Sequence, residues 1–367
     1  MKANRNSFLF LLIILFVLTD YSNITKAQSN RDYLKVKYLN KEINVRLNYD
    51  SNPQKTKERI LKNLNLKLEV KIGGMEDTTL FRPISVKTDK NENIYILDQI
   101  DCKVKKFNPQ GVFIKSYGRK GKGPGETEMP TRMDVSQEGK ILIVDQNLQK
   151  GVLFIDKKTF DFNYKYSPDD ICFSSEKSFC VFQQMSLNIF PQIIQYDFSG
   201  NILHEYESLI DKNSVKELPP FIFTLTGEII SNYDKIIYVP KYLNHIVGFD
   251  NTGKIKFGSK TIDIFKSLPE VDIFSVPEMD MIASKAPQTD NISAINTGVV
   301  NNNVWIISLP ALTKYKKKVF DIYSIEDGSY LFSYITGDIG QFIQIYLYAK
   351  RIFVINADAS VSVMKIL

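Results

Sequence analysis

The chain has 367 residues, of which 44% are hydrophobic and 24% are charged, and this balance excludes global disorder because it provides enough apolar surface for a full core. The net charge of +6 at pH 7 is spread along the chain without a dense basic block, so we expect neither nucleic acid nor a membrane surface as a partner. Three cysteines in a chain of this length exclude a disulfide scaffold.

The first 27 residues have the pattern of an export signal. Lys2 and Arg5 give a positive start, residues 8–18 form an apolar run of eleven, and residues 25–27 place small side chains at both positions that define a cleavage site. The run is too short for a stable membrane span, although an uncleaved anchor is the alternative. No cysteine lies near the end of the run, which excludes the lipid-modified cysteine of a bacterial lipoprotein, and no later segment reaches eighteen apolar residues. We therefore expect a periplasmic or extracellular protein with no membrane span after signal removal.

Residues 28–65 are expected to form a small N-terminal extension that packs on the domain after it. Residues 33–39 (YLKVKYL) and 43–49 (INVRLNY) alternate apolar and polar side chains, which predicts two short strands. Residues 52–64 (NPQKTKERILKNL) predict a short helix, with Pro53 near its start and an apolar side made of Ile60, Leu61 and Leu64. We expect removal of residues 28–50 to be tolerated better than loss of the strands that close the domain.

Short runs rich in Ile, Val, Phe and Tyr recur through residues 66–367. Six of them are too short for helices and predict strands, namely NIYILDQ at 93, KILIVDQ at 140, SFCVFQQ at 178, KIIYVPK at 235, NVWIISL at 303 and RIFVINA at 351. A hairpin follows each of the first five, and its turn is usually closed by glycine, as at Gly111, Gly200, Gly253 and Gly328. Six such units of four strands predict an all-β fold, a six-bladed β-propeller of four-stranded antiparallel blades.

The sixth unit lacks its last strand, and the start of the domain supplies a candidate. SVSVMKIL at 360–367 gives only the first half of a hairpin, whereas LKLEVKIGG at 66–74 alternates with period two and precedes the first unit. We expect these two segments to pair and to close the ring.

The long interval between Phe249 and Tyr323 predicts an inserted loop between blades.

The segment GRKGKGPGETEMPTRMDVSQEGKILIVDQ at 118–146 resembles the repeat of NHL-type six-bladed propellers. In that repeat a glycine-rich turn leads through a proline into the inner strand, and the next strand ends in Asp. The segment is similar in particular to six-bladed propellers exported by gut bacteria, whose hallmark is a G-x-G-P-G-E turn, here at 121–126. The resemblance covers about residues 66–367 and is close over 81–166. Beyond that range the Asp ending is replaced by Gln183, Pro240, Ser308 and Asn356.

The stretch GRKGKGPGE at 118–126 has the composition of a phosphate-binding loop but not its spacing. A Walker-type loop would need Gly-Lys-Ser/Thr where Gly123 and Pro124 stand, and a dinucleotide loop would need a third glycine at Glu126. We therefore expect a structural turn between two blades, made by Gly121, Gly123, Pro124, Gly125 and Glu126. The alternative is an anion-attracting rim of Arg119, Lys120 and Lys122.

A set of polar residues precedes the six strand anchors by eight or nine positions. If the hairpins are equal in length, these residues converge on the central channel: Ser85, Arg132, Asp170, Glu228, Asn296 and Gln344. Six-bladed propeller lactonases and related hydrolases hold a catalytic calcium with Glu, Asn and Asp, so the resemblance implies a metal-dependent hydrolase or lyase as the alternative function. Channel mouths are polar in any case because water fills them, and Arg132 would lie beside any cation. We therefore favour a monomeric, non-catalytic binding module for a protein or glycan, with no cofactor.

Catalytic motifs are scarce elsewhere in the chain. The two histidines, His204 and His245, lie in hairpins of different blades, which argues against a His-based metal triad or dyad, and each is expected at the surface or at an edge.

Cys172 and Cys180 would face each other if their hairpin turns about Glu176. A cross-strand disulfide and a pair of buried free thiols both remain open.

Overall fold

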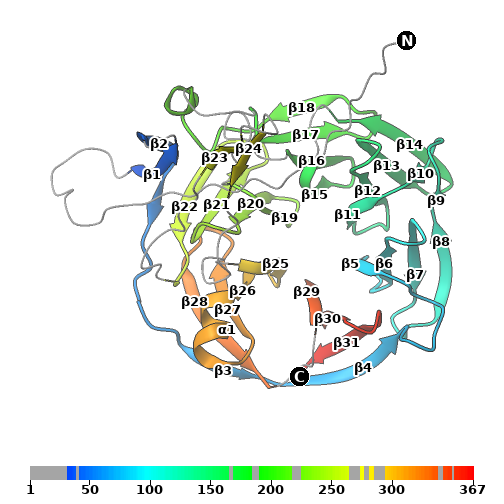
Figure 1. Cartoon of the computed structure of the whole chain (residues 1–367). Coiled ribbons are helices and arrows are strands. Elements are labelled where there is room, and N and C mark those ends of the chain that lie inside the picture. The colour runs from blue at the N-terminus through cyan, green and yellow to red at the C-terminus, as the bar shows by residue number, and fades with distance from the viewer. Residues whose placement is uncertain are drawn as a thin grey trace, which may run out of the picture.

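The structure is a computed structural model that describes residues 31–38, 41–164, 168–183, 190–216, 225–263, 273–276, 281–284, 294–337, 342–348 and 351–367. In this part of the chain six four-stranded antiparallel sheets form a ring, which confirms the six-bladed β-propeller (Figure 1). The expected export signal at 1–27 lies outside the described residues. No helix among the described residues is long and apolar enough to cross a membrane.

Each of the first three blades uses consecutive strands, with the first strand nearest the channel (Figure 1). Blade 1 consists of β5 (Pro83–Thr88), β6 (Ile94–Asp98), β7 (Lys103–Phe107) and β8 (Phe113–Tyr117). Blade 2 consists of β11 (Pro130–Val135), β12 (Ile141–Asp145), β13 (Lys150–Ile155) and β14 (Lys158–Asn163). Blade 3 consists of β15 (Pro168–Ser175), β16 (Ser178–Gln183), β17 (Ile193–Asp197) and β18 (Ile202–Glu205).

The last three blades also recruit strands from the N-terminal part of the chain. Blade 4 consists of β19 (Gly227–Ser231), β20 (Lys235–Pro240), β21 (His245–Asp250) and β22 (Ile255–Lys260), and is extended outward by β2 (Lys41–Asn52) and β1 (Arg31–Tyr38). Blade 5 consists of β25 (Ala294–Val300), β26 (Asn303–Ser308), β27 (Val319–Ser324) and β28 (Tyr330–Thr336), with β3 (Leu61–Leu64) outside them. Blade 6 consists of β29 (Phe342–Tyr348), β30 (Arg351–Asn356), β31 (Val361–Ile366) and β4 (Leu66–Ile72).

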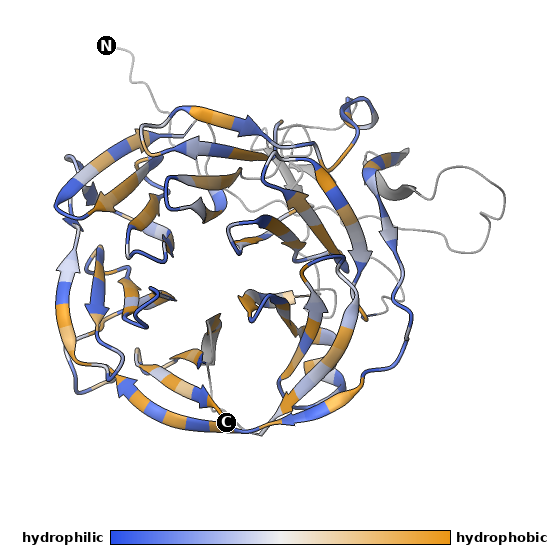
Figure 2. Cartoon of the chain, turned by 180° about the vertical axis from the view of Figure 1, so that it is seen from behind, coloured by the Kyte–Doolittle hydropathy of each residue, from blue (hydrophilic) through white to orange (hydrophobic). Residues whose placement is uncertain are grey.

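The hydrophobic core lies between the blades. Every residue of β6 and β12 is buried, because each of these second strands is covered on both faces by neighbouring sheets. One core cluster, for example, joins Tyr95 and Leu97 of blade 1 to Met133 and Ile141 of blade 2. Hydrophobic and polar residues alternate along the strands at the periphery of the ring (Figure 2). Continuous apolar runs therefore mark second strands, and alternating runs mark the outer ones.

The ring closes as the sequence predicts. β31 pairs antiparallel with β4, from Val361 opposite Ile72 to Ile366 opposite Leu66. The two strands lie side by side near the carboxyl end of the chain (Figure 1). Blade 6 therefore combines strands from both ends of residues 66–367.

The predicted helix at 52–64 is wrong. Residues 53–60 form no regular element, and residues 61–64 form β3, which pairs in parallel with β28 of blade 5. Just upstream, the end of β2 pairs in parallel with β22 of blade 4 at Ser51 opposite Gly258. We call residues 51–72 the belt, because they run along the outer edges of blades 4, 5 and 6 (Figure 1). The unpaired N–H and C=O groups of those edges override the helical pattern of the segment.

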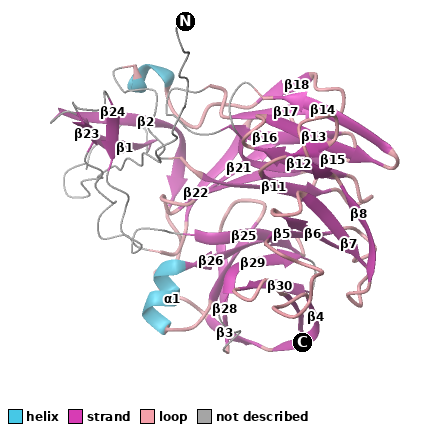
Figure 3. Ribbon diagram, turned by 45° about the vertical axis from the view of Figure 1, so that its right-hand side comes forward, coloured by secondary structure: helices cyan, strands magenta, loops and turns pink. Residues whose placement is uncertain are grey.

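The predicted strands at 33–39 and 43–49 are present as β1 and β2, but their role is larger than expected. Val45, Leu47 and Tyr49 are buried in one core cluster with residues of blades 3 and 4, including Tyr238. The hairpin of β1 and β2 projects from the rim of the ring beside β22 (Figure 3). Loss of residues 28–50 would uncover part of the core, so we expect it to destabilise the protein, and the expectation that it is milder than loss of the closing strands stays a prediction.

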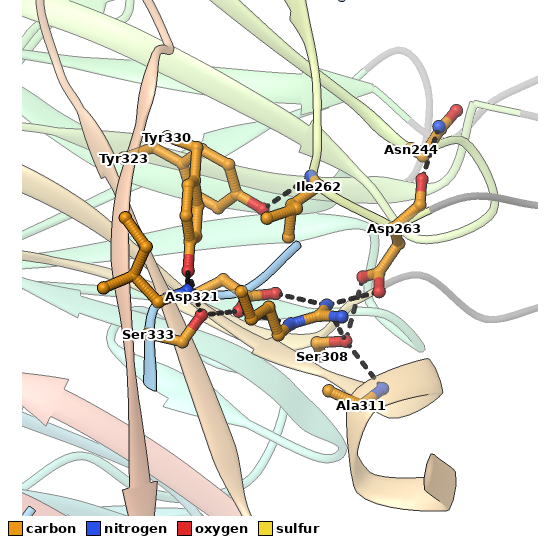
Figure 4. Close-up of polar contacts among 11 residues, drawn as sticks. Asn244, Ile262, Asp263, Ser308, Ala311, Asp321, Tyr323, Tyr330 and Ser333 are labelled. Atoms are coloured by element: carbon orange, nitrogen blue, oxygen red, sulfur yellow. Dashed lines mark hydrogen bonds and ion pairs between the residues drawn. The ribbon is translucent and has the colours of Figure 1, made fainter. Parts of the chain in front are cut away.

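The belt is anchored by one buried arginine between blades 4 and 5. The Arg59 guanidinium contacts Asp263 through Nη2 and binds both carboxylate oxygens of Asp321, with Nε–Oδ1 at 2.9 Å and Nη2–Oδ2 at 2.7 Å. Ser308 joins the cluster by donating to Asp263 Oδ2 at 2.9 Å, and Ser333 donates to Asp321 Oδ1 at 2.6 Å (Figure 4). The side chain of Asp321 is fully buried and that of Asp263 is 3% exposed. Two buried carboxylates thus depend on one belt residue for charge balance.

Several short elements complete the structure. β9 (Arg119–Lys120) and β10 (Glu126–Thr127) pair within the glycine-rich turn. Within the predicted inserted loop, β23 (Ile273–Val276) and β24 (Met281–Ser284) form an antiparallel pair. The 3-10 helix η1 is Lys212–Val215, and α1 (Leu309–Tyr315) begins after Ser308, whose hydroxyl accepts from Ala311 N at 3.0 Å (Figure 4).

Deleting residues 360–367 should give insoluble protein or a molten state without a cooperative transition. The deletion removes the fully buried Val361 and Val363, each worth roughly 1.5–3 kcal/mol, and leaves the edges of β30 and β4 unpaired. Thermal unfolding followed by near-UV circular dichroism measures the effect. Deleting only Leu367, which is 73% exposed, is the control and should leave the melting temperature nearly unchanged. Cooperative melting of the longer deletion near the wild-type temperature would refute closure by β31 and β4.

Replacing Arg59 by Met should lower the free energy of unfolding by about 3–5 kcal/mol, because two carboxylates would stay buried without a counter-charge. Urea unfolding measures the loss. Adding Asp263→Asn and Asp321→Asn to Arg59→Met should recover part of it, since the uncompensated charges are then removed. Arg119→Met is the matched control, because the Arg119 side chain in its ion pair with Glu126 is 75% exposed and the pair should be worth less than about 1 kcal/mol.

Candidate functional site

The channel-facing strands carry all six residues that the sequence assigns to the channel. The residues lie on six different inner strands: Ser85 on β5, Arg132 on β11, Asp170 on β15, Glu228 on β19, Asn296 on β25 and Gln344 on β29. Their positions in the blades are equivalent, because five of them pair with corresponding second-strand residues, namely Leu97, Val144, Phe182, Val239 and Ile355. The expected register is therefore present in the structure.

A backbone irregularity recurs at this position. In five of the six inner strands the register shifts beside the channel residue, for example between Pro83 and Ser85 and between Pro130 and Arg132. A bulge inserts an extra residue and re-aims the side chains next to it. Similar bulges around the ring thus give these residues similar orientations.

The channel contains a cavity of about 430 Å³ at the end where the inner strands begin, which we call the entry cavity. Its lining includes Ser85, Arg132, Asp170, Glu228 and Asn296, so the structure brings five of the six predicted residues together. The side chain of Gln344 lies outside the described part of the chain. A second cavity of about 380 Å³, the exit cavity, lies at the other end of the inner strands.

Polar contacts join every pair of neighbouring blades around the channel. Most place a side-chain oxygen of one inner strand against a backbone N–H of the next blade. In ring order the contacts are Lys87 Nζ–Asp134 Oδ1 (3.1 Å), Phe173 N–Asp134 Oδ2 (2.7 Å), Ile229 N–Asp170 Oδ2 (2.9 Å), Thr297 N–Glu228 Oε2 (2.7 Å), Ile345 N–Asn296 Oδ1 (3.4 Å) and Tyr346 Oη–Ile84 O (2.7 Å). The acidic channel residues therefore have a structural role.

Asp170 has the most perturbed carboxyl group of the entry cavity. Burial raises its pKa to about 7; the positive charge of Arg132 opposes this increase and the negative charge of Glu228 adds to it. The neighbouring Asp169 also has a raised pKa because of burial. Arg132 Nε lies 3.9 Å from Asp170 Oδ1. Burial therefore favours the protonated form of Asp170 more than that of an exposed aspartate.

The donor set of the entry cavity does not fit calcium. Both oxygens of Glu228 are engaged, Oε2 by the backbone N–H and hydroxyl of Thr297 and Oε1 by Asn296 Nδ2 at 3.4 Å. Asp170 Oδ2 accepts from Ile229 N, and the guanidinium of Arg132 lies beside Oδ1. Calcium needs six to eight oxygen ligands. Among the described residues no three acidic, His or Cys side chains gather in a way that could hold a metal.

The glycine-rich turn binds a carboxylate of its own. Glu126 Oε2 accepts from Gly123 N at 2.8 Å, and Oε1 accepts from Arg119 Nε at 2.6 Å, which together lower the pKa of Glu126. A Cβ atom on Gly121, whose φ is +153°, would lie only 2.1 Å from Glu126 Oε2. The turn connects β8 to β11, as predicted. Gly123 N and Arg119 are thus occupied within the turn, and Lys122 Nζ lies 3.6 Å from Glu128, whereas Lys120 is exposed.

The structure corrects one of the two histidine expectations. His204 is exposed, whereas His245 is buried, with 5% exposure, and its Nδ1 lies 3.0 Å from the hydroxyl of Tyr49. The strand β2, which the sequence did not place on blade 4, covers it. Burial lowers the pKa of His245 to about 3, with a contribution from the charge of Lys260. His245 is therefore a neutral core residue, and its pKa does not suit a general base at neutral pH.

Cys172 and Cys180 lie directly opposite each other on β15 and β16, as predicted from their hairpin. Both are buried free thiols in the structure, and Cys180 Sγ lies 3.5 Å from the hydroxyl of Tyr206. Burial raises the pKa of Cys172 well above its usual value. Such thiols behave as small core residues.

Comparison with known proteins supports the fold. No family profile and no curated protein matches the chain. A Bacteroides fragilis protein described as a candidate exported protein is similar in structure, with a TM-score of 0.52 and 14% identity over 86% of this chain and 99% of that chain. Virginiamycin B lyase from Staphylococcus aureus has a TM-score of 0.48 and 12% identity over 83% of this chain and 100% of that one. A streptogramin B lyase gives 0.49 and 12% over 83% and 98%. At 14% identity the likeness to the Bacteroides fragilis protein shows the fold alone, and the two lyases, with TM-scores below 0.5, add nothing to that conclusion.

The buried His245 should make stability depend on pH. Its folded pKa is lowered to about 3, so below the unfolded value of about 6.5 the unfolded state binds a proton that the native state does not. Stability should therefore fall with decreasing pH, by about 2 kcal/mol at about pH 5 relative to neutral pH. Urea unfolding of wild type and His245→Gln at both pH values isolates this contribution. An identical pH dependence in the variant would show that His245 is not buried in neutral form.

Proposed function

We propose that this chain is an exported, non-catalytic, NHL-like propeller that binds a protein or glycan ligand through the propeller face on which the entry cavity opens. The observation that supports this function best is the division of roles in that cavity. Its acidic side chains accept backbone hydrogen bonds between blades, whereas Arg132 presents unused N–H groups to the cavity. The cavity is therefore equipped to hold a ligand, and it lacks a free carboxylate set for catalysis.

Export and monomeric state belong to the same proposal. Residues 1–27 have the charge and hydropathy pattern of a cleaved signal, and one structural neighbour is described as a candidate exported protein. The belt adds strands to the outer sides of blades 4, 5 and 6, and β8, β14 and β18 are the outer strands of blades 1, 2 and 3. We place the protein in the periplasm or outside the cell, as a monomer without a cofactor.

The second candidate is a hydrolase or lyase, and Asp170 is the observation that favours it. A carboxyl group with a pKa of about 7 in a cavity has the properties of a general acid or base. Its bond to Ile229 N and the Arg132 guanidinium beside it also explain the site as a contact between blades. A metal-dependent version would require Glu228 to give up its bonds to Thr297.

Metal content and calcium-dependent stability distinguish the two candidates. We expect purified mature protein to contain no stoichiometric calcium, and its melting temperature to be equal in calcium and in chelator, because only a ligand that binds the native state raises apparent stability. Elemental analysis and thermal shift provide the measurements. Stoichiometric calcium, lost together with stability in Glu228→Gln, would favour the enzyme. Glycan-array and pull-down screens with the same protein then identify the ligand.

A further inference from the structure

Basic side chains from three blades meet in the entry cavity. Arg82 precedes β5, Lys87 lies on β5, Arg132 lies on β11 and Lys241 follows β20. The acidic side chains that line the same cavity are Asp170 and Glu228. Because Lys87 is paired with Asp134 at 3.1 Å, the other three basic side chains are the ones set against Asp170 and Glu228 in this cavity.

The guanidinium of Arg132 is held in place while part of it stays open. Its Nε donates to the backbone oxygen of Asp169 at 2.8 Å, and its Nη1 donates to the backbone oxygen of Thr131 at 3.0 Å. A guanidinium has five N–H groups, so three remain, two of them on Nη2. The side chain is 40% exposed. A fixed guanidinium with open N–H groups is the arrangement that binds carboxylate, sulfate or phosphate in a bidentate manner.

From this geometry, and building on the proposed function, we propose that the entry cavity binds a sugar-sized ligand through an oxyanion group, with Arg132 as the central contact. Arg82 is exposed at the rim and makes no ion pair with the described residues, so it can contact the same anion. Lys87 lies deeper and stays protonated, because Asp134 and Asp170 raise its pKa although burial opposes its charge. Its charge is balanced by Asp134, so the contacts available to the ligand are those of Arg132 and Arg82.

The size of the cavity limits the ligand. A volume of about 430 Å³ lies within the range of roughly 300–1,000 Å³ typical of small-molecule sites. It admits one or two sugar units or a similar compact molecule, and it is too small for a folded partner surface. Because the site is recessed, its low local dielectric strengthens the contact between an anion and the guanidinium.

The exit cavity has fewer charged lining residues than the entry cavity, and this difference indicates at which end of the channel an anion would bind. Its polar lining is mostly neutral, with Gln137, Asn232, Tyr233, Asn301 and Asn302, and its charged residues are the ion-paired Lys87 and Asp134. Arg82, Arg132 and Lys241 line the entry cavity only. The excess of basic over acidic lining residues is thus at the entry end of the channel, so an anionic ligand should bind at that end.

The test uses sugars that differ in one group. Binding of D-glucuronate, glucose 6-sulfate, glucose 6-phosphate and D-glucose to the mature protein is measured by calorimetry at low and high salt. We expect one or more of the three anionic sugars to bind, more weakly at high salt because the contact is electrostatic, and D-glucose not to bind. The anionic sugar that binds best identifies the preferred oxyanion.

Variants locate the site. Arg132→Gln should weaken binding of the anionic sugar by roughly tenfold or more, and Arg132→Lys should restore only part of it because lysine cannot bind in a bidentate manner. Arg82→Gln, at an exposed position, should weaken binding without changing the melting temperature, which keeps the test valid if Arg132→Gln folds poorly. Lys158→Gln is the charge-matched control on the outer strand β14 and should bind as wild type.

The outcomes separate this inference from the proposed function. If no anionic sugar binds, or if binding is equal in the wild type, Arg82→Gln and Arg132→Gln, the oxyanion site is overturned. Binding of neutral glycans alone would overturn it too, while leaving the binding module intact. Turnover of a ligand with stoichiometric metal would instead overturn the proposed function.

Discussion

The pairing of β31 with β4 is the contact on which the rest of the ring depends. The core lies between blades, and one of its clusters joins Val361 and Val363 of blade 6 to Ile94 and Ile96 of blade 1. An open ring would expose that cluster as well as a sheet edge. The same pairing fixes the path of the chain upstream, because β3 and the end of β2 reach blades 5 and 4 along the belt that leads into β4. The strand that closes the ring, β4, is thus the last part of the belt.

The channel follows from a second constraint, which is the supply of hydrogen-bond acceptors. An innermost strand has one edge without a neighbouring strand, so its N–H groups need other partners. Side chains of the preceding blade provide them, as Asp170 does for Ile229 N and Glu228 for Thr297 N. Polar residues at these positions are therefore required by the architecture whether or not a ligand binds.

Local periodicity and repetition were sufficient to predict the six blades, their closure and the register of the channel residues, because each of these depends on patterns that recur within a unit. Longer-range contacts were not predictable from the same patterns. The segment at 52–64 has a helical arrangement of Ile60, Leu61 and Leu64, but blade edges and the Asp263–Asp321 pair hold it extended. His245 is buried because Tyr49 covers it from a strand 196 residues away. Arg59 is the one arginine of this segment and stands among Lys55, Lys57 and Lys62, so the local sequence did not indicate that it would bind two buried carboxylates.

The two constraints together explain why the chemistry of the channel is cationic. Carboxylates that accept backbone N–H groups between blades bring negative charge into a narrow space, and that charge must be balanced. Lys87 balances Asp134 directly, and Arg132 lies beside Asp170 while its own bonds go to backbone oxygens. Asp170 and Glu228 each accept a backbone N–H from the next blade, whereas the guanidinium retains open N–H groups. The groups that remain available to a ligand are therefore the N–H groups of the Arg132 guanidinium, and these bind an oxyanion.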